Sequence, residues 1–139
     1  MEDFTTFLCF EVGVAARKLH KYYNNRFSQY GITVTQSFIL FALIMQDGQN
    51  VKNLAERLSL ESPAVTGLVD RLEKEKMVER RSDPEDRRAL RVFLTEKGRG
   101  LAEKLITVAV EFNDVLKSRL NMQQVKALKD LLASIDGTV

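Results

Sequence analysis

Residues 82–98, SDPEDRRALRVFLTEKG, crowd three acids and two arginines around Pro84 and continue into an alternating apolar segment. An arginine at the tip of a stiff hairpin can enter a narrow DNA minor groove, where the electrostatic potential is most negative. Arg87 and Arg88 are the candidates. Asp86 stands two residues before Arg88 and is expected to orient its guanidinium, so that less side-chain entropy is lost on binding. The alternative is a charged turn whose exposed ion pairs contribute about 0–1 kcal/mol each.

Residues 62–75 have the pattern of a helix that presents one face to a partner. Serine at the N-cap and proline at the first helical position are a common helix start. The apolar residues recur at steps of three and four, which predicts one buried face: Val65, Leu68, Val69 and Leu72. The outward residues expected to contact DNA are Ser62, Pro63, Ala64, Thr66, Gly67, Arg71 and Lys74.

The outward residues suit a helix that enters a major groove through its N-terminal part. Small residues there let the backbone approach closely, and the helix N-terminus can hold a phosphate. Arg71 can donate twice to a guanine edge, and Lys74 is assigned to a phosphate. The alternative is an ordinary solvated face. On the preceding helix, Lys52 and Arg57 either contact flanking phosphates or belong to a solvated face.

Composition limits the other chemistry. The chain has 139 residues, a net charge of +2, one cysteine and one histidine. Cys9 alone cannot form an internal disulfide or a thiolate cage, and His20 alone makes zinc sites and histidine triads unlikely candidates, so no metal, cofactor or enzyme activity is expected. The net charge is too small to indicate nucleic-acid binding, so any such prediction must rest on where the charged residues lie in the sequence. The absence of a signal peptide or long apolar run predicts a cytoplasmic location and no membrane association.

The elements that position these residues follow from capping signals and periodicity. Residues 4–30 form a predicted helix that ends at Gly31, and Thr33 with Gln36 forms a capping box for the next. Residues 46–50 are a predicted turn, Asn50 caps residues 51–58, and two strands, 77–81 and 89–94, flank the charged tip. Thr95 starts a long helix, and Asn121 with Gln124 starts the last one, which Gly137 ends.

This order predicts a single, mainly α domain over residues 1–139 with a small β-hairpin. Residues 33–94 hold three helices and the hairpin, and two of the helices meet across a short turn, which is a winged helix-turn-helix. Long terminal helices, residues 4–30 and 96–136, frame this DNA-binding lobe. Apolar ridges on residues 4–19, 101–116 and 125–135 exceed what a small domain needs, and we expect them to form an isologous homodimer interface. The alternative is intramolecular packing alone.

Residues 51–98 resemble the MarR (multiple antibiotic resistance regulator) family of transcription factors. The match is sharpest at Asp86-x-Arg88, which is followed by Leu94-Thr95 and Gly98. The resemblance implies a cytosolic homodimer that binds pseudo-palindromic double-stranded operators, acts as a repressor and is released by a small effector. It also implies that Asp86 and Arg88 serve the wing in DNA binding.

The segment Leu8-Cys9-Phe10 is similar to the organic-hydroperoxide-responsive branch of the same family. In that branch, two tyrosines from the partner chain hydrogen-bond a reactive cysteine. Tyr23 occupies the place of one, but Val34 stands at the other, and no second cysteine is present. The alternatives for Cys9 are a peroxide sensor and a plain buried or interfacial cysteine.

Three further alternatives remain at the level of the sequence. The basic run Arg17, Lys18, Lys21 and Arg26 either lines a cleft for a phenolic or carboxylate effector or forms a solvated face. A winged-helix protein-interaction module would use the same fold, but the small outward residues of the 62–75 helix favour DNA. A one-cysteine peroxidase would need a base and a resolving thiol, which the sequence does not offer.

Overall fold

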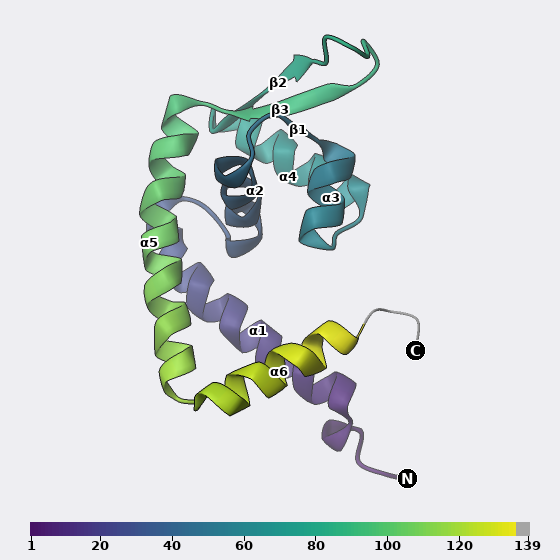
Figure 1. Cartoon of the computed structure of the whole chain (residues 1–139), viewed down its shortest axis with the longest axis vertical. Coiled ribbons are helices and arrows are strands. Elements are labelled where there is room, and N and C mark those ends of the chain that lie inside the picture. Colours follow the sequence, from purple (N-terminus) through teal and green to yellow (C-terminus); the bar gives the residue numbers. More distant parts are fainter. Residues whose placement is uncertain (136–139) are drawn as a thin grey trace. The chain divides into compact units, whose positions relative to one another are not determined.

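The structure, a computed structural model, describes residues 1–135 (Figure 1). The chain divides into two compact units, Met1–Ile106 and Thr107–Val139. Gly137, the predicted end of the last helix, lies outside the described residues. The described elements are η1 (Phe4–Thr6), α1 (Leu8–Phe27), η2 (Ser28–Tyr30), α2 (Val34–Met45), β1 (Gln49–Asn50), α3 (Val51–Leu58), α4 (Ser62–Lys74), β2 (Val78–Ser82), β3 (Leu90–Leu94), α5 (Glu96–Ser118) and α6 (Met122–Ser134). The mainly α fold with a small sheet is confirmed.

The first helix is not continuous over residues 4–30, so that prediction is wrong at both ends. The Asp3 carboxylate accepts the Thr5 N–H at 3.0 Å and starts a short 3-10 turn instead of an α-helix. Phe7 is then extended, with φ −70° and ψ 137°, and α1 starts afresh at Leu8. At the other end a second 3-10 turn, η2, leads to Gly31, whose φ of +70° is left-handed and ends the segment as predicted.

The helix-turn-helix consists of α3 and α4. Asn50 caps α3 by accepting the Asn53 N–H at 2.8 Å, as predicted. Ser59 lies in the left-handed region with φ 55°, which lets the chain turn sharply from α3 toward α4. The capping box of Thr33 and Gln36 at the start of α2 is also confirmed.

The sheet has three strands in the order β1–β3–β2, all antiparallel, and not the two of a simple hairpin. The register of the hairpin pairs Val78 with Leu94 and Ser82 with Leu90. Gln49 and Asn50, predicted as part of a turn, pair with Val92 and Arg91. This pairing joins residues about forty positions apart, so local turn signals in residues 46–50 gave no sign of it.

The core of the first unit fixes which face of α4 points outward. Its fully buried side chains come from α1, α2, α3, α4, the sheet and the first part of α5: Phe27, Ile39, Leu40, Leu43, Leu54, Val65, Val69, Val78, Val92 and Leu105. Val65 and Val69 turn one side of α4 inward, so its opposite side faces solvent.

The second unit holds the end of α5 and the helix α6. Asn121 and Gln124 form the predicted capping box at the start of α6. Three leucines of α6, Leu128, Leu131 and Leu132, remain exposed, as does Ile135 directly after the helix. Within residues 1–135 no single helix is both long and apolar enough to cross a membrane. The segments Leu8–Tyr30 and Val34–Met45 pass such a test only when joined, and they bend by 75°.

Candidate nucleic-acid interface

The outer face of α4 presents the residues that the helical pattern selected. Val65, Val69 and Leu72 are buried and Leu68 is half-buried, so the predicted inner face is confirmed. All seven outward candidates are exposed: Ser62, Pro63, Ala64, Thr66, Gly67, Arg71 and Lys74. Their exposure is compatible with contact to a partner, and their roles in DNA binding stay predictions.

The start of α4 differs by one residue from the prediction. The Glu61 carbonyl accepts the first helical hydrogen bond, from the Val65 N–H at 3.2 Å, so Glu61 is the N-cap and Ser62 is already helical. Pro63 therefore takes the second position. Its missing N–H costs nothing there, because the first four N–H groups of a helix have no partner within the helix.

The wing is the hairpin of β2 and β3, and its tip is the loop of residues 83–89 between them. Two aspartates shape this tip. The Asp83 carboxylate accepts the Glu85 N–H at 2.9 Å and the Arg91 Nε–H at 3.0 Å. These two interactions, in that order, hold the pKa of Asp83 below its ordinary value. The Asp86 carboxylate accepts the backbone N–H of Arg88 at 3.0 Å, and the Asp86 carbonyl accepts the Ala89 N–H at 3.0 Å.

The predicted orientation of the Arg88 guanidinium by Asp86 is therefore not what the structure contains. Asp86 holds the Arg88 backbone, and the ion pair of the tip joins Asp83 to Arg91. The reason is geometric, since a short aspartate side chain reaches the N–H two residues ahead more readily than a long arginine reaches back. Arg87 and Arg88 are both exposed at the tip.

A groove of about 610 Å³ brings Thr66 and Arg88, two residues predicted to contact DNA, to one surface. Its other lining residues come from the start of α3 and from the wing: Asn50, Val51, Lys52, Arg80, Ala89, Leu90 and Val92. Among the described residues that line it, three are cationic and none is acidic. Because Arg80 is paired with Asp70 and Glu73, the attraction for an anionic backbone rests on Lys52 and Arg88. The groove connects the outer face of α4 with the wing.

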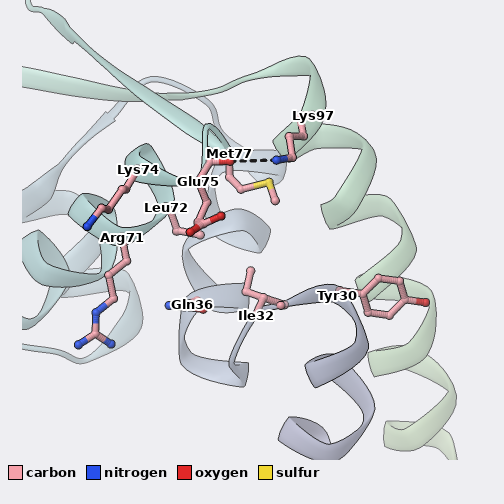
Figure 2. A pocket seen from close by; sticks show the side chains of 10 residues that line it. Tyr30, Ile32, Gln36, Arg71, Leu72, Lys74, Glu75, Met77 and Lys97 are labelled. Atoms are coloured by element: carbon pink, nitrogen blue, oxygen red, sulfur yellow. Dashed lines mark hydrogen bonds between the residues drawn. The ribbon is translucent and has the colours of Figure 1, made fainter.

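A second cavity, of about 370 Å³, lies beside the C-terminal end of α4 (Figure 2). It is lined by Tyr30, Gly31, Ile32, Gln36, Arg71, Leu72, Lys74, Glu75, Met77 and Lys97. Lys97 Nζ donates to the Glu75 carbonyl at 3.1 Å. Sequence patterns did not reveal this cavity, because its walls come from three separate segments. The basic run of α1 that was considered for an effector cleft does not line it.

Cys9 is exposed in the chain, and Tyr23 lies fourteen residues further along α1. At 1.5 Å per residue this separates the two by about 21 Å along the helix axis, so they cannot meet within one chain. Tyr23 packs against Phe27 with ring centroids 5.8 Å apart. Burial, followed by the neighbouring Tyr22, raises the pKa of Tyr23 above its ordinary value.

Comparison with known proteins gives consistent matches. The model of the MarR family matches residues 32–90. The HTH-type transcriptional regulator SarZ of Staphylococcus aureus is 34% identical over 108 residues, which covers 77% of this chain and 73% of SarZ.

Two solved structures show a similar fold over nearly the whole chain. The S. aureus MepR–DNA complex has a TM-score of 0.88 at 24% identity and covers 96% of this chain and 98% of MepR. Bordetella bronchiseptica BpsR, whose DNA binding is regulated by 6-hydroxynicotinic acid, has a TM-score of 0.89 at 22% identity. The match covers 100% of this chain and 99% of BpsR.

Proposed function

The chain belongs to the MarR family of DNA-binding transcriptional regulators, and from this premise we propose that it is a homodimeric repressor of a pseudo-palindromic operator. Like its relatives it is a regulator and not an enzyme. Release from the operator follows binding of a small anionic effector, and the protein acts in the cytoplasm.

The cation-lined groove between α4 and the wing is the observation that carries this proposal. A helix presented with small residues at its N-terminal end fits a major groove, and an arginine on the adjoining hairpin fits the neighbouring minor groove. Thr66 and Arg88 line the same groove, and Lys52 supplies a third contact with the backbone. The MepR–DNA complex shows that a protein of this fold binds DNA.

Each chain carries a single α4, so it can read only a half-site. A two-fold dimer presents two such helices to half-sites spaced one or more helical turns apart, about 34 Å each. The exposed apolar residues of α1 and α6 support a dimer interface of this kind. A pseudo-palindromic operator follows from the symmetry of the dimer.

The cavity of about 370 Å³ supports release by an effector. Ile32, Leu72 and Met77 provide an apolar wall for a ring, and Arg71, Lys74 and Lys97 provide cations for a carboxylate or phenolate. Arg71 and Lys74 also belong to the outer face of α4, so an anion in the cavity competes with DNA for them (Figure 2). An effector that binds the DNA-free form better shifts the population away from the operator-bound state.

Fluorescence anisotropy with an operator defined by random-sequence selection tests DNA recognition. Wild-type protein is expected to bind tightly, to resist shuffled competitor DNA and to show a steep salt dependence. Arg88→Ala should weaken binding about tenfold or more, which is about 1.4 kcal/mol. Lys104→Ala removes an equal charge from an exposed position of α5 and should change affinity about twofold at most.

Selection that enriches no sequence would contradict sequence-specific regulation. Equal affinity of folded Arg88→Ala and wild-type protein would contradict the role of the wing. Circular dichroism of each variant separates loss of contact from loss of fold.

The exposure of Cys9 favours one second candidate, in which its oxidation by peroxide releases the DNA. Exposed thiolates are the ones that peroxide oxidises readily, and Tyr23 of a second chain would be the hydrogen-bonding partner. Loss of operator binding on treatment of wild-type protein with organic peroxide, but not of Cys9→Ser, would support this sensor. A Cys9→Ser variant that responds like wild-type protein would exclude it.

A further inference from the structure

Arg80 connects the wing to α4 through three hydrogen bonds. Its Nη1 donates to Glu73 Oε1 at 2.8 Å, and its Nη2 pairs with Asp70. Its backbone N–H donates to Glu73 Oε2 at 3.0 Å. The side chain of Arg80 is only 18% exposed, whereas that of Asp70 is 60% exposed.

The backbone hydrogen bond matters because β2 is an outer strand of the sheet. The N–H of Arg80 points away from β3 and would otherwise be open to water. Glu73 accepts this N–H and the guanidinium at once, so one side chain of α4 fixes both the backbone and the side chain of the wing. Charge-assisted hydrogen bonds to both carboxylate oxygens fix the orientation of the two elements as well as adding stability.

Asp70 lies in the middle of the outer face of α4. Thr66 stands four residues before it and Lys74 four residues after it, and residues four apart share one face of a helix. A carboxylate at this place repels DNA phosphates unless a cation is held against it. Arg80 is that cation, and it also lines the groove that contains Thr66 and Arg88. Burial lowers the pKa of Arg80, but the hydrogen bonds that its guanidinium donates to Asp70 and Glu73 raise it overall, so the guanidinium stays charged.

We propose that Arg80 is a positioning residue for DNA binding, which fixes the wing against α4 and neutralises Asp70 on the surface that α4 presents to DNA. The proposal rests on the proposed DNA-binding function. The proposal goes beyond that function because it assigns the fixed spacing between α4 and the wing to Arg80. Arg80 sets this spacing through its bonds to Glu73 and Asp70.

Arg81 offers a matched control in the same strand. Successive side chains of a strand point to opposite faces, so Arg81 faces away from α4. Its guanidinium pairs with Glu79 of its own strand and lies 4.4 Å from the centre of the Phe93 ring. Replacing it with glutamine removes the same charge as replacing Arg80, but leaves the bonds between the wing and α4 in place.

The experiment compares Arg80→Gln with Arg81→Gln in two measurements. Hydrogen exchange without DNA should show the amide of residue 80 exchanging about fivefold faster or more in Arg80→Gln than in wild-type protein, with little change there in Arg81→Gln. Operator affinity should fall about tenfold or more in Arg80→Gln and about twofold at most in Arg81→Gln. The added substitution Asp70→Asn should restore about threefold or more of the lost affinity while exchange stays fast.

Rescue by Asp70→Asn is an outcome that a purely structural role of Arg80 does not produce. Equal exchange and equal affinity in Arg80→Gln and Arg81→Gln would overturn the proposal, and failure of Asp70→Asn to restore affinity would overturn the neutralisation of Asp70. Absence of operator binding in wild-type protein would instead contradict the proposed function. The exchange measurement needs no DNA and would still decide whether Arg80 holds the wing.

Discussion

At the scale of single residues, the wing tip depends on aspartates that bind backbone. The Asp83 side chain is 13% exposed and accepts both the Glu85 N–H and the Arg91 guanidinium at the base of the tip. Asp86 does the same for the Arg88 N–H. The tip that carries Arg88 is thus held in shape by carboxylates, while the Arg88 side chain remains exposed for a partner.

The lowered pKa of Asp83 predicts how the tip responds to acid. Because the folded-state pKa lies below the unfolded-state value near 3.9, the carboxylate stabilises the tip above that value, and this contribution is lost as pH falls through the folded-state pKa. We expect the NMR shift of the Asp83 side-chain carboxyl carbon to stay constant from about pH 8 to about pH 5 and to titrate with a midpoint below about 3.9. Asp83→Asn should abolish this titration. A midpoint at or above the unfolded-state value would contradict the assigned hydrogen bonds.

The sequence predicted which residues face outward better than it predicted their partners. Exposure of Thr66 and Arg71 follows from the 3.6-residue period of α4, which is local. The bonds of Arg80 to Glu73 and Asp70 cross from a strand to a helix seven and ten residues away. Nothing in the local pattern distinguishes Arg80 from Arg81, so the choice between them required the packing of β2 on α4.

At the scale of elements, Thr95 and Gly98 shape the corner where the chain passes from β3 into α5, beside the start of β2. The Thr95 hydroxyl donates to the Lys76 carbonyl at 2.7 Å and accepts the Gly98 N–H at 3.0 Å, so it caps α5 and ties it to the start of β2. A Cβ on Gly98 would lie 1.9 Å from the Met77 carbonyl oxygen. Only glycine allows α5 to approach this backbone so closely.

Gly98→Ala should therefore destabilise the fold, with Gly100→Ala as the control two residues along the same helix. The clash at residue 98 is with backbone, which cannot rotate away, and we expect a loss of about 1–3 kcal/mol in the free energy of unfolding. A Cβ on Gly100 meets nothing within 4 Å, so alanine there should stabilise by about 0.5–1 kcal/mol through helix propensity. Urea unfolding measures both. Similar free energies for the two variants would show that α5 does not need the close approach.

Among the elements, those with local signals were predicted and those that depend on distant pairing were not. The side chains of Thr33, Asn50 and Asn121 each accept the backbone N–H three residues ahead, so spacing alone identified these caps. The strand β1 has only two residues and exists because β3 pairs with it. The break at Phe7 follows from the 3-10 turn that Asp3 caps. The chain leaves this turn in an extended conformation at Phe7, so the α-helix starts only at Leu8.

At the scale of the whole molecule, exposed apolar side chains occur in both compact units. In the first unit they include four on the N-terminal segment: Phe4, Phe7, Leu8 and Val12. In the second they include Leu128, Leu131 and Leu132 of α6 and Ile135 directly after it. Burying one such side chain stabilises by about 1.5–3 kcal/mol, so a second chain that covers them would gain substantial free energy. The same contact would set the distance between two copies of α4.

Substitution of Leu128 and Leu132 by glutamate tests this link between association and operator binding. The two residues lie four apart on the exposed face of α6 and are not buried in the chain itself, so the charges should disrupt association without unfolding the protomer. Sedimentation should show a dimer for wild-type protein and a monomer for the variant at micromolar concentration, with operator affinity reduced about 100-fold or more, because a monomer engages one half-site without the gain from a linked second. Gln123→Glu adds charge to an exposed polar position of α6 and should remain dimeric.

A monomeric wild-type protein would contradict the homodimer, whereas a dimeric Leu128→Glu/Leu132→Glu variant would place the interface on other residues. A monomer that keeps full affinity would separate operator recognition from the spacing of two α4 helices.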